Sequence, residues 1–389
     1  MVAATAFVPN SPVRMPYLVE YDSKGQPLPE PSVSQDPELS RAYLNAYQQY
    51  YERIDTILKA SKFVLGLSAY IDDVLLRQSS GILMEWNEDK GTILTSAHLF
   101  CSRPPNVDVW LGGQEYARDA EVRVQLLHID DVEVRGQLIY LDEQYGFALI
   151  SVPMDPAETL PRFCNELIFS EDIFLLGRDR WDLQIENCKV MNKGAGSYQH
   201  HHYMYFDAVV SGCCFGGAVI NLEGVVIGLI ASAIEFIPSS TILKCLHLWR
   251  TFNCIPRIHL GMKLFGIKCL NLKSKEKISR KYHIDAGLIV LEVSGGSNAE
   301  THGVRIGDTV NRECIATAIQ LENMLLDTCK GYLEKGIGCD SDKDVVLVLD
   351  VFNTTKRLPG RIHLTAKLSR GVEIIERVRI SVYLGYALF

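Results

Sequence analysis

The residues of this chain that could do chemistry are a histidine and a pair of adjacent cysteines. His98 closes the run Thr-Ser-Ala-His at residues 95–98, and Cys213 and Cys214 lie among the glycines of residues 212–217. A histidine can take the proton of a nucleophile, and a cysteine thiolate paired with it can attack a carbonyl without an acid. A serine nucleophile needs a third group, most often an aspartate, to orient the histidine. Attack on a carbonyl carbon by a nucleophile that a histidine activates is therefore the chemistry to test.

Short apolar segments separated by turn residues must position these groups. Strands of such length and spacing are typical of antiparallel sandwiches or barrels. A helix is predicted at residues 239–251, after the last of these strands. The predicted strands are residues 62–70, 74–76, 81–86, 91–96, 121–128, 132–141, 147–152, 172–176, 187–191, 204–210, 217–221 and 225–234.

Two segments resemble the HtrA (Deg, protease Do-like) family of trypsin-like serine proteases. Residues 91–99, Gly-Thr-Ile-Leu-Thr-Ser-Ala-His-Leu, are similar to the strand and turn that carry the family's catalytic histidine. Residues 207–221 are similar to its nucleophile segment, Asp-Ala-Ala-Ile-Asn-Pro-Gly-Asn-Ser-Gly-Gly-Pro-Leu-Val-Asn, and residues 222–228 continue the match. The resemblance implies a mainly β fold, a trypsin-like (chymotrypsin-like) double β-barrel over residues 62–254, with His98 as the retained base.

The same resemblance leaves the other two catalytic positions degenerate. Gly146 stands where the family's Asp-Leu-Ala-Leu segment has its aspartate. Counting forward from Asp207 and backward from Asn221 places Phe215 at the serine, without a gap in either direction. A glycine cannot orient an imidazole and a phenylalanine cannot attack a carbonyl. We therefore expect a catalytically impaired homologue, a pseudoprotease that binds peptides or protein partners.

An acid from a neighbouring position is one alternative. Asp142 and Glu143 precede Gly146 closely, and a shifted loop could bring one of them to His98.

A cysteine-type peptidase is the second alternative. Residues 212–214 resemble the Gly-x-Cys-Gly-Gly motif of viral-type chymotrypsin-fold proteases, with Phe215 inserted, so Cys214 could act with His98. The insertion would shift the turn that aims the nucleophile and the oxyanion-hole amides, and a Cβ at Cys213 favours a flipped amide there. Both cysteines can also be small apolar core residues.

Residues 255–389 resemble the PDZ-like α+β domain that follows the barrels in this family. The matching stretches are residues 257–264, 286–293, 297–300 and 303–310, and the Gly-Asp turn of the last stretch is the most specific. Such domains bind extended peptides by strand addition, with backbone amides taking the terminal carboxylate. The resemblance implies peptide or protein C-termini as partners. The implied peptide-binding residues are Leu260, Gly261 and Met262 in the carboxylate loop and Leu321 and Leu325 on a helix predicted at residues 316–330, although both leucines can equally be core.

The chain before the barrels divides into a proline-rich extended arm at residues 1–35 and one amphipathic helix at residues 36–61. The helix is predicted from apolar residues at near-helical spacing after an Asp-Pro start. Because relatives often assemble through N-terminal segments, we expect this helix to act in a homo- or hetero-oligomer.

Composition narrows the remaining classes. The 389 residues are 47% hydrophobic and 22% charged, and the net charge of −8 argues against nucleic acid as a partner. Eleven cysteines without a Cys-x-x-Cys pair disfavour zinc ribbons and fit free thiols in a reducing compartment. Neither a secretory signal nor a bilayer-spanning apolar stretch is found, so a cytoplasmic or nuclear location is expected. No cofactor or metal is predicted: residues 200–202, three histidines, are expected in an exposed loop, and residues 273–277 in a solvated loop.

Overall fold

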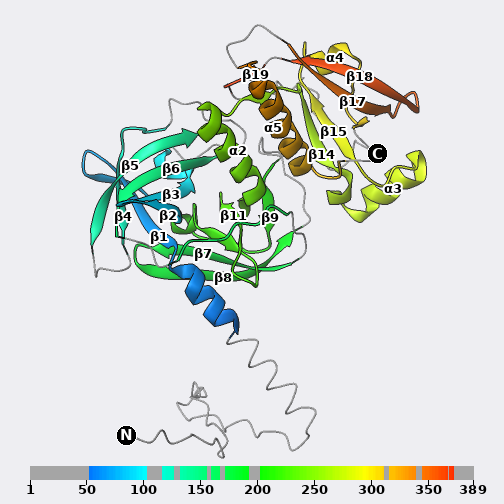
Figure 1. Cartoon of the computed structure of the whole chain (residues 1–389). Coiled ribbons are helices and arrows are strands. Elements are labelled where there is room, and N and C mark those ends of the chain that lie inside the picture. The colour runs from blue at the N-terminus through cyan, green and yellow to red at the C-terminus, as the bar shows by residue number, and fades with distance from the viewer. Residues whose placement is uncertain are drawn as a thin grey trace, which may run out of the picture. The chain divides into compact units, whose positions relative to one another are not determined.

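Two closed six-stranded barrels and a five-stranded sheet form the main body of the protein (Figure 1). The computed structural model describes residues 52–102, 116–126, 132–155, 159–166, 171–191, 202–310, 315–338, 344–366 and 368–371. Residues 54–389 make one compact unit. The fold is mainly β, as the sequence predicts.

The first barrel has the strand order β1-β2-β3-β6-β5-β4, with every pairing antiparallel. Register shifts in β1, β2 and β5 interrupt these pairings, as the bends of a small closed barrel require. The predicted strands 74–76 and 81–86 are one strand, because the residues between them keep pairing with β1. The strands are β1 (Val64–Ile71), β2 (Val74–Asn87), β3 (Lys90–Ser96), β4 (Glu121–Gln125), β5 (Glu133–Asp142) and β6 (Phe147–Pro153).

The second barrel repeats this design with the order β10-β11-β12-β9-β8-β7. The predicted strand at residues 225–234 is wrong in its second half. Ala231 and Ser232 both donate backbone hydrogen bonds to the Glu235 carbonyl, so the chain turns and starts another strand. The elements are β7 (Asp172–Asp179), β8 (Asp182–Met191), β9 (Met204–Phe206), β10 (Ala218–Ile220), β11 (Val226–Ile230), β12 (Glu235–Pro238) and the helix α2 (Ser239–Phe252).

The C-terminal part is a sheet of order β14-β15-β16-β17-β18, flanked by helices. A separate short pair joins β13 to β19. The strand β14 lies at one end of the sheet order, beside helix α5. The elements are β13 (Arg257–Ile258), β14 (Met262–Gly266), α3 (Leu272–Tyr282), β15 (Leu288–Val293), α4 (Asn298–Thr301), β16 (Thr309–Val310), α5 (Ala318–Glu334), β17 (Val345–Asn353), β18 (Leu358–Ala366) and β19 (Leu368–Ser369).

The solvated loop expected at residues 273–277 is instead part of helix α3. The Asn271 side chain accepts from the Ser274 amide and begins the helix, and His283 ends it in the left-handed region. Ile278 is the one buried residue of the helix, so a single apolar anchor holds a mostly charged segment that a hydrophobicity pattern does not reveal.

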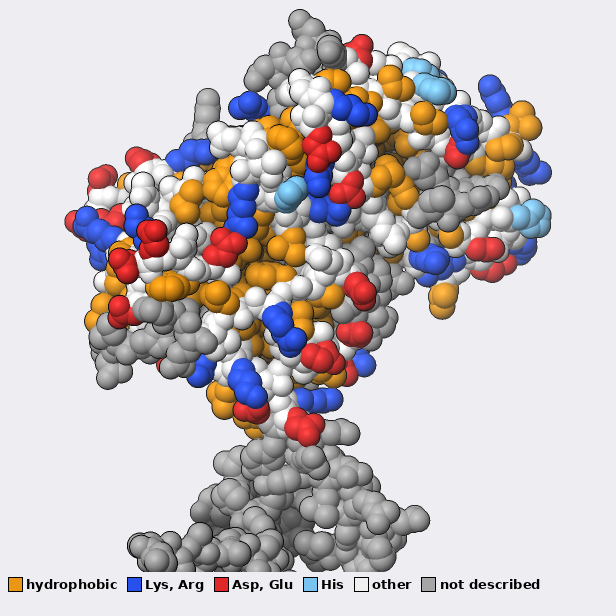
Figure 2. Space-filling view, in the orientation of Figure 1, with side chains coloured by type: hydrophobic (Ala, Val, Ile, Leu, Met, Phe, Trp, Pro, Cys, Tyr) orange, Lys and Arg blue, Asp and Glu red, His pale blue; other side chains and the backbone are white. Residues whose placement is uncertain are grey.

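Several predictions lie wholly or partly outside the described residues. The arm at residues 1–35 is among them, and of the helix expected at 36–61 the structure describes residues 52–61 as helical. None of the described helices is both long and apolar enough to cross a bilayer. On the face shown in Figure 2, the described acidic and basic side chains are interspersed without a broad area of one sign.

Candidate functional site

His98 lies at the end of β3, on the 3₁₀ turn Ala97–Phe100. The Ser96 hydroxyl accepts from the His98 amide and begins this turn. The imidazole is half-buried, and burial followed by the positive charge of Arg77 lowers its pKa to about 4. His98 is therefore neutral at pH 7, and no carboxylate among the described residues counteracts the lowering.

Gly146 lies next to the histidine turn, because the Ala97 amide donates to the Gly146 carbonyl over 2.8 Å. Its φ of +72° is one that L side chains rarely adopt. A Cβ added here would lie 2.2 Å from the Tyr203 hydroxyl, which in turn donates to the Tyr145 carbonyl over 3.3 Å. Tyr203 thus fills the space that the first atom of a side chain at position 146 would need.

The structure places both neighbouring carboxylates elsewhere. Asp142 is buried and pairs with Arg257 at 2.6 Å, while Tyr140 donates to its second oxygen. Glu143 pairs with Arg118 at 2.7 Å. These partners leave neither acid engaged with His98.

Phe215 faces the histidine directly. It follows the 3₁₀ turn Gly212–Cys214, and its ring centroid lies 5.0 Å from that of His98 in an edge-to-face arrangement. The structure thus brings His98, Gly146 and Phe215 together. Aromatic packing replaces the hydrogen bond that a serine would make to the imidazole.

Cys214 points into the apolar core of the second barrel. The thiol packs against Gly177 of β7, where a Cβ would come within 2.8 Å of the sulfur. Burial raises its pKa to about 11. Cys213 is half-buried, with its sulfur 2.8 Å from the Ser211 hydroxyl. Cys214 therefore stays a thiol at neutral pH, which is the opposite of an activated nucleophile.

The amide of Phe215, which follows this turn, is already hydrogen-bonded and therefore unavailable to an oxyanion. In a trypsin-like site the amide of the nucleophile residue helps to bind the oxyanion. Here the Phe215 amide donates to the Gly212 carbonyl over 3.2 Å. The Ser80 amide, at 2.7 Å, and the Ser79 hydroxyl both donate to the Phe215 carbonyl, and the Ser80 hydroxyl donates to the Cys213 carbonyl over 2.6 Å. Sequence reasoning missed these two serines, whose only signal is two hydroxyls inside a buried strand.

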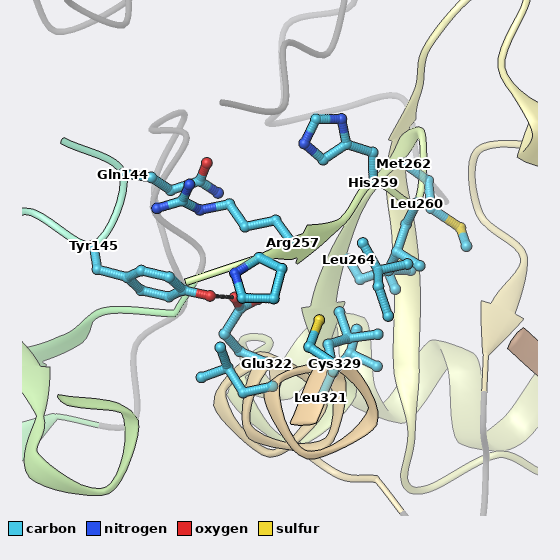
Figure 3. Close-up of a pocket in the computed structure, with 14 residues that line it drawn as sticks. Gln144, Tyr145, Arg257, His259, Leu260, Met262, Leu264, Leu321, Glu322 and Cys329 are labelled. Carbon is cyan, nitrogen blue, oxygen red and sulfur yellow. Dashed lines mark hydrogen bonds between the residues drawn. The ribbon is translucent and has the colours of Figure 1, made fainter. Parts of the chain in front are cut away.

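A second candidate site lies between β14 and α5 (Figure 3). It is a narrow cavity of about 20 Å³. Leu260, Met262, Leu321 and Leu325, four of the five predicted peptide-binding residues, line it together. Gly261 is not among the lining residues; it has φ +69° and approaches Ser297. The complete lining is Gln144, Tyr145, Pro256, Arg257, Ile258, His259, Leu260, Met262, Leu264, Leu321, Glu322, Leu325, Leu326 and Cys329.

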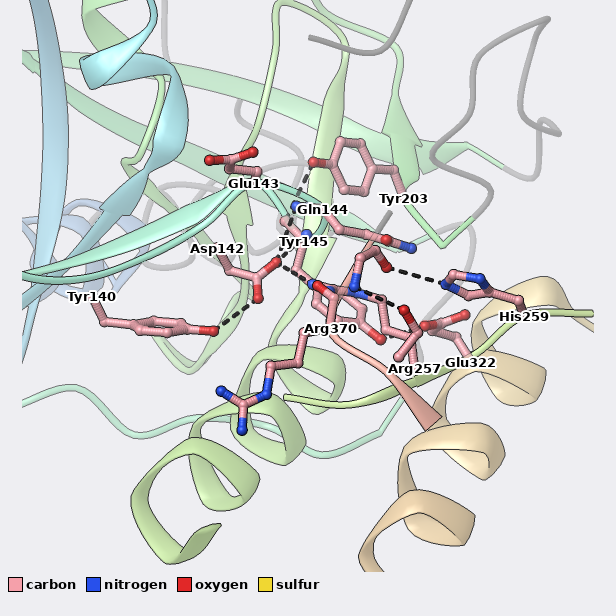
Figure 4. Close-up of polar contacts among 12 residues, drawn as sticks. Tyr140, Asp142, Glu143, Gln144, Tyr145, Tyr203, Arg257, His259, Glu322 and Arg370 are labelled. Carbon is pink, nitrogen blue, oxygen red and sulfur yellow. Dashed lines mark hydrogen bonds and ion pairs between the residues drawn. The ribbon is translucent and has the colours of Figure 1, made fainter. Parts of the chain in front are cut away.

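One wall of this cavity is polar and comes partly from the first barrel. The Tyr145 hydroxyl donates to Glu322 of α5 over 2.5 Å, and both residues are buried. The guanidinium of Arg257 lies 5.0 Å from the Tyr145 ring centre while it pairs with Asp142 (Figure 4). Sequence reasoning missed this wall, because the turn and the helix that meet here are far apart along the chain.

The prediction that residues 200–202 lie in an exposed loop is wrong for His202. His202 is 2% exposed and packs between the rings of Tyr145 and Tyr203. Aromatic neighbours on both sides explain the burial. Among the described residues, no group of histidines, cysteines and acids is arranged to hold a metal ion, and all nine described cysteines are free.

Several known proteins are similar to this chain. Residues 79–229 match the family model described as a trypsin-like peptidase domain. A serine protease Do-like HtrA from Lactococcus lactis subsp. lactis (strain IL1403) is 22% identical over 273 residues, which are 64% of this chain and 63% of that protein. The namesake from L. lactis subsp. cremoris (strain MG1363) is 27% identical over 120 residues, 27% of this chain and 30% of that protein. The chain thus spans less than two thirds of either relative.

A solved structure shows the same fold, and a second is similar to this chain. A variant of the HtrA-type protease AlgW, solved with a tripeptide, has a TM-score of 0.50 at 16% identity and is matched over 83% of this chain and 98% of its own. A serine endoprotease from Yersinia pestis gives a TM-score of 0.47 at 14% identity, over 81% and 97% of the two chains.

Proposed function

We propose that this chain, which belongs to the HtrA/Deg (protease Do-like) family, is a pseudoprotease that binds peptides or protein C-termini without hydrolysing them. In this proposal residues 62–254 form the degenerate protease domain and residues 255–389 a PDZ-like binding domain. A homo- or hetero-oligomer remains a prediction of the N-terminal sequence.

The observation that carries the loss of hydrolysis is the contact between Phe215 and His98. An aromatic ring occupies the position from which a serine would attack, 5.0 Å from the imidazole centre. Gly146 and the Phe215 amide support the same conclusion, since the first offers no acid and the second is already bonded within its turn. Among the described residues, the site thus has no nucleophile or acid at the expected positions, and the amide at the nucleophile position is bonded within its own turn.

Peptide binding is supported by the arrangement of β14 and α5. The strand ends the sheet order and the apolar side of a helix lies beside it, which is the geometry used for recognition by strand addition. Met262 of β14 and Leu321 and Leu325 of α5 converge there, together with Leu260 from the segment before β14. Apolar ligand side chains would pack among them.

The cysteine-peptidase alternative finds no supporting contact. Cys214 is 5% exposed, lies in the core, and its pKa of about 11 opposes thiolate formation.

Two assays test the proposal together. Wild-type protein should show no labelling by a fluorophosphonate or by a peptidyl chloromethyl ketone, whereas an active trypsin-like protease labels in parallel. Peptides selected from a library of random decapeptides with free C-termini should bind, and binding should survive His98→Ala. Labelling of the wild type that disappears in Cys214→Ala or His98→Ala would show that an active peptidase persists.

A further inference from the structure

The barrel contributes a side chain to the groove that the C-terminal part offers. Tyr145 belongs to the turn between β5 and β6, is 1% exposed, and lies in the wall of the cavity with its hydroxyl bonded to Glu322 (Figure 3). We propose that Tyr145 is a removable plug of the peptide groove, so that a peptide binds only after this side chain has withdrawn. The plug matters only if the groove binds peptides, as proposed above.

The size of the cavity supports the plug. About 20 Å³ holds roughly one water molecule, far below the ~300–1,000 Å³ typical of ligand pockets. An apolar peptide side chain therefore needs space that the present arrangement does not offer. Among the residues around the cavity, Tyr145 is a large side chain that comes from outside the strand and helix of the groove itself.

The turn that carries the plug is held on both sides (Figure 4). One oxygen of Asp142 accepts from the amides of Gln144, at 3.0 Å, and Tyr145, at 2.8 Å, and from Arg257 at the start of β13. On the other side Tyr203, seated against Gly146, donates to the Tyr145 carbonyl. Because Gly146 has no side chain, Tyr203 can lie against it and stabilise the turn that carries Tyr145.

Other contacts keep α5 on the barrel without the plug. Asn323 bonds to both Thr241, at 3.0 Å, and Ser240, at 3.1 Å, and Lys244 pairs with Asp327. Loss of the Tyr145 hydroxyl should therefore open the groove while α5 stays docked on α2. This separation makes the plug testable by single substitutions.

The test compares the affinity of one peptide, selected as above and labelled with fluorescein, for wild type, Tyr145→Phe and Tyr145→Ala. Tyr145→Phe keeps the ring and loses one charge-assisted hydrogen bond, so we expect binding about tenfold tighter. Tyr145→Ala should bind at least as tightly as Tyr145→Phe. The matched control is Tyr332→Phe, which removes a hydroxyl of α5 that contacts the Val346 amide and does not line the cavity, and should leave the affinity unchanged.

The failures are distinguishable. Equal affinities of wild type, Tyr145→Phe and Tyr145→Ala would overturn the plug and leave peptide binding standing, and weaker binding of both variants would instead make Tyr145 part of the binding surface. Absence of selected binders for every variant would overturn peptide binding itself. Because Tyr145→Phe changes one buried hydroxyl only, it keeps the test valid if Tyr145→Ala does not fold.

Discussion

Phe215 differs from a serine because it has no hydroxyl to donate and because its ring packs against His98. Its ring meets the edge of His98, and burial with Arg77 nearby keeps that imidazole neutral. A triad histidine must accept a proton during attack, and an acid normally stabilises the resulting charge. His98 is therefore a retained residue without the electrostatic setting of a base.

The pKa of His98 predicts how stability depends on pH. An unfolded histidine protonates near pH 6.5, whereas folded His98 protonates near pH 4, so the unfolded state binds more protons between these values. The free energy of unfolding should therefore fall as pH is lowered from about 6.5 to 4. Urea unfolding at pH 7 and pH 5, with His98→Asn as the control that flattens the dependence, checks this. An NMR titration that places His98 near 6.5 or above would contradict it.

Gly146 predicts a site-specific penalty for any side chain. Gly146→Ala should lower the thermal midpoint for two reasons. An alanine in the left-handed conformation costs about 1–2 kcal/mol, and its Cβ would clash with the Tyr203 hydroxyl. The matched control is Gly296→Ala, which has the same φ of +72° but nothing within 4 Å of the added carbon. An equal loss in the two variants would show that the Tyr203 contact is unimportant.

The same clash predicts that restoring the aspartate and the serine by substitution does not restore activity. Gly146→Asp combined with Phe215→Ser should not label with a fluorophosphonate, since Tyr203 fills the volume of the acid and the turn keeps its amide bonded. Labelling of this double variant at a rate near that of an active protease would contradict the prediction.

At the scale of elements, the strand β13 is fixed to the first barrel by a buried ion pair. Arg257 and Asp142 are 8% and 5% exposed, and Arg257 also donates to the Arg370 carbonyl beside β19. Removing one partner of a buried pair leaves an uncompensated charge. This pair therefore contributes to the attachment of the C-terminal part, beside the contacts between α2 and α5.

Arg257→Met should thus reduce the free energy of unfolding by about 3–5 kcal/mol. The control is Arg361→Met, whose partner Asp350 is on the surface, 62% exposed, and whose loss should leave the unfolding midpoint nearly unchanged. Urea denaturation followed by circular dichroism measures both. Similar midpoints for the two variants would show that the buried pair does not hold the fold.

At the scale of the whole molecule, the barrels were predictable because their signals are local. Short apolar runs separated by turn residues, and the segments around His98 and Phe215, have a regular spacing in the sequence, and the structure places those two residues in contact. The pairing of Tyr145 with Glu322 joins residues 177 positions apart, so no local pattern could indicate it. Helix α3 was missed because it depends on one capping side chain and one buried apolar residue. The burial of His202 was missed because it depends on contacts with two aromatic rings, those of Tyr145 and Tyr203.

The most direct test of non-hydrolytic peptide binding is one equilibrium experiment with mass detection. The selected decapeptide is incubated overnight with wild type and with His98→Ala, its dissociation constant is measured, and the peptide is then recovered and weighed by mass spectrometry. We expect the same dissociation constant for both proteins and an intact peptide in both samples. Cleaved peptide with the wild type and intact peptide with His98→Ala would contradict the proposed function.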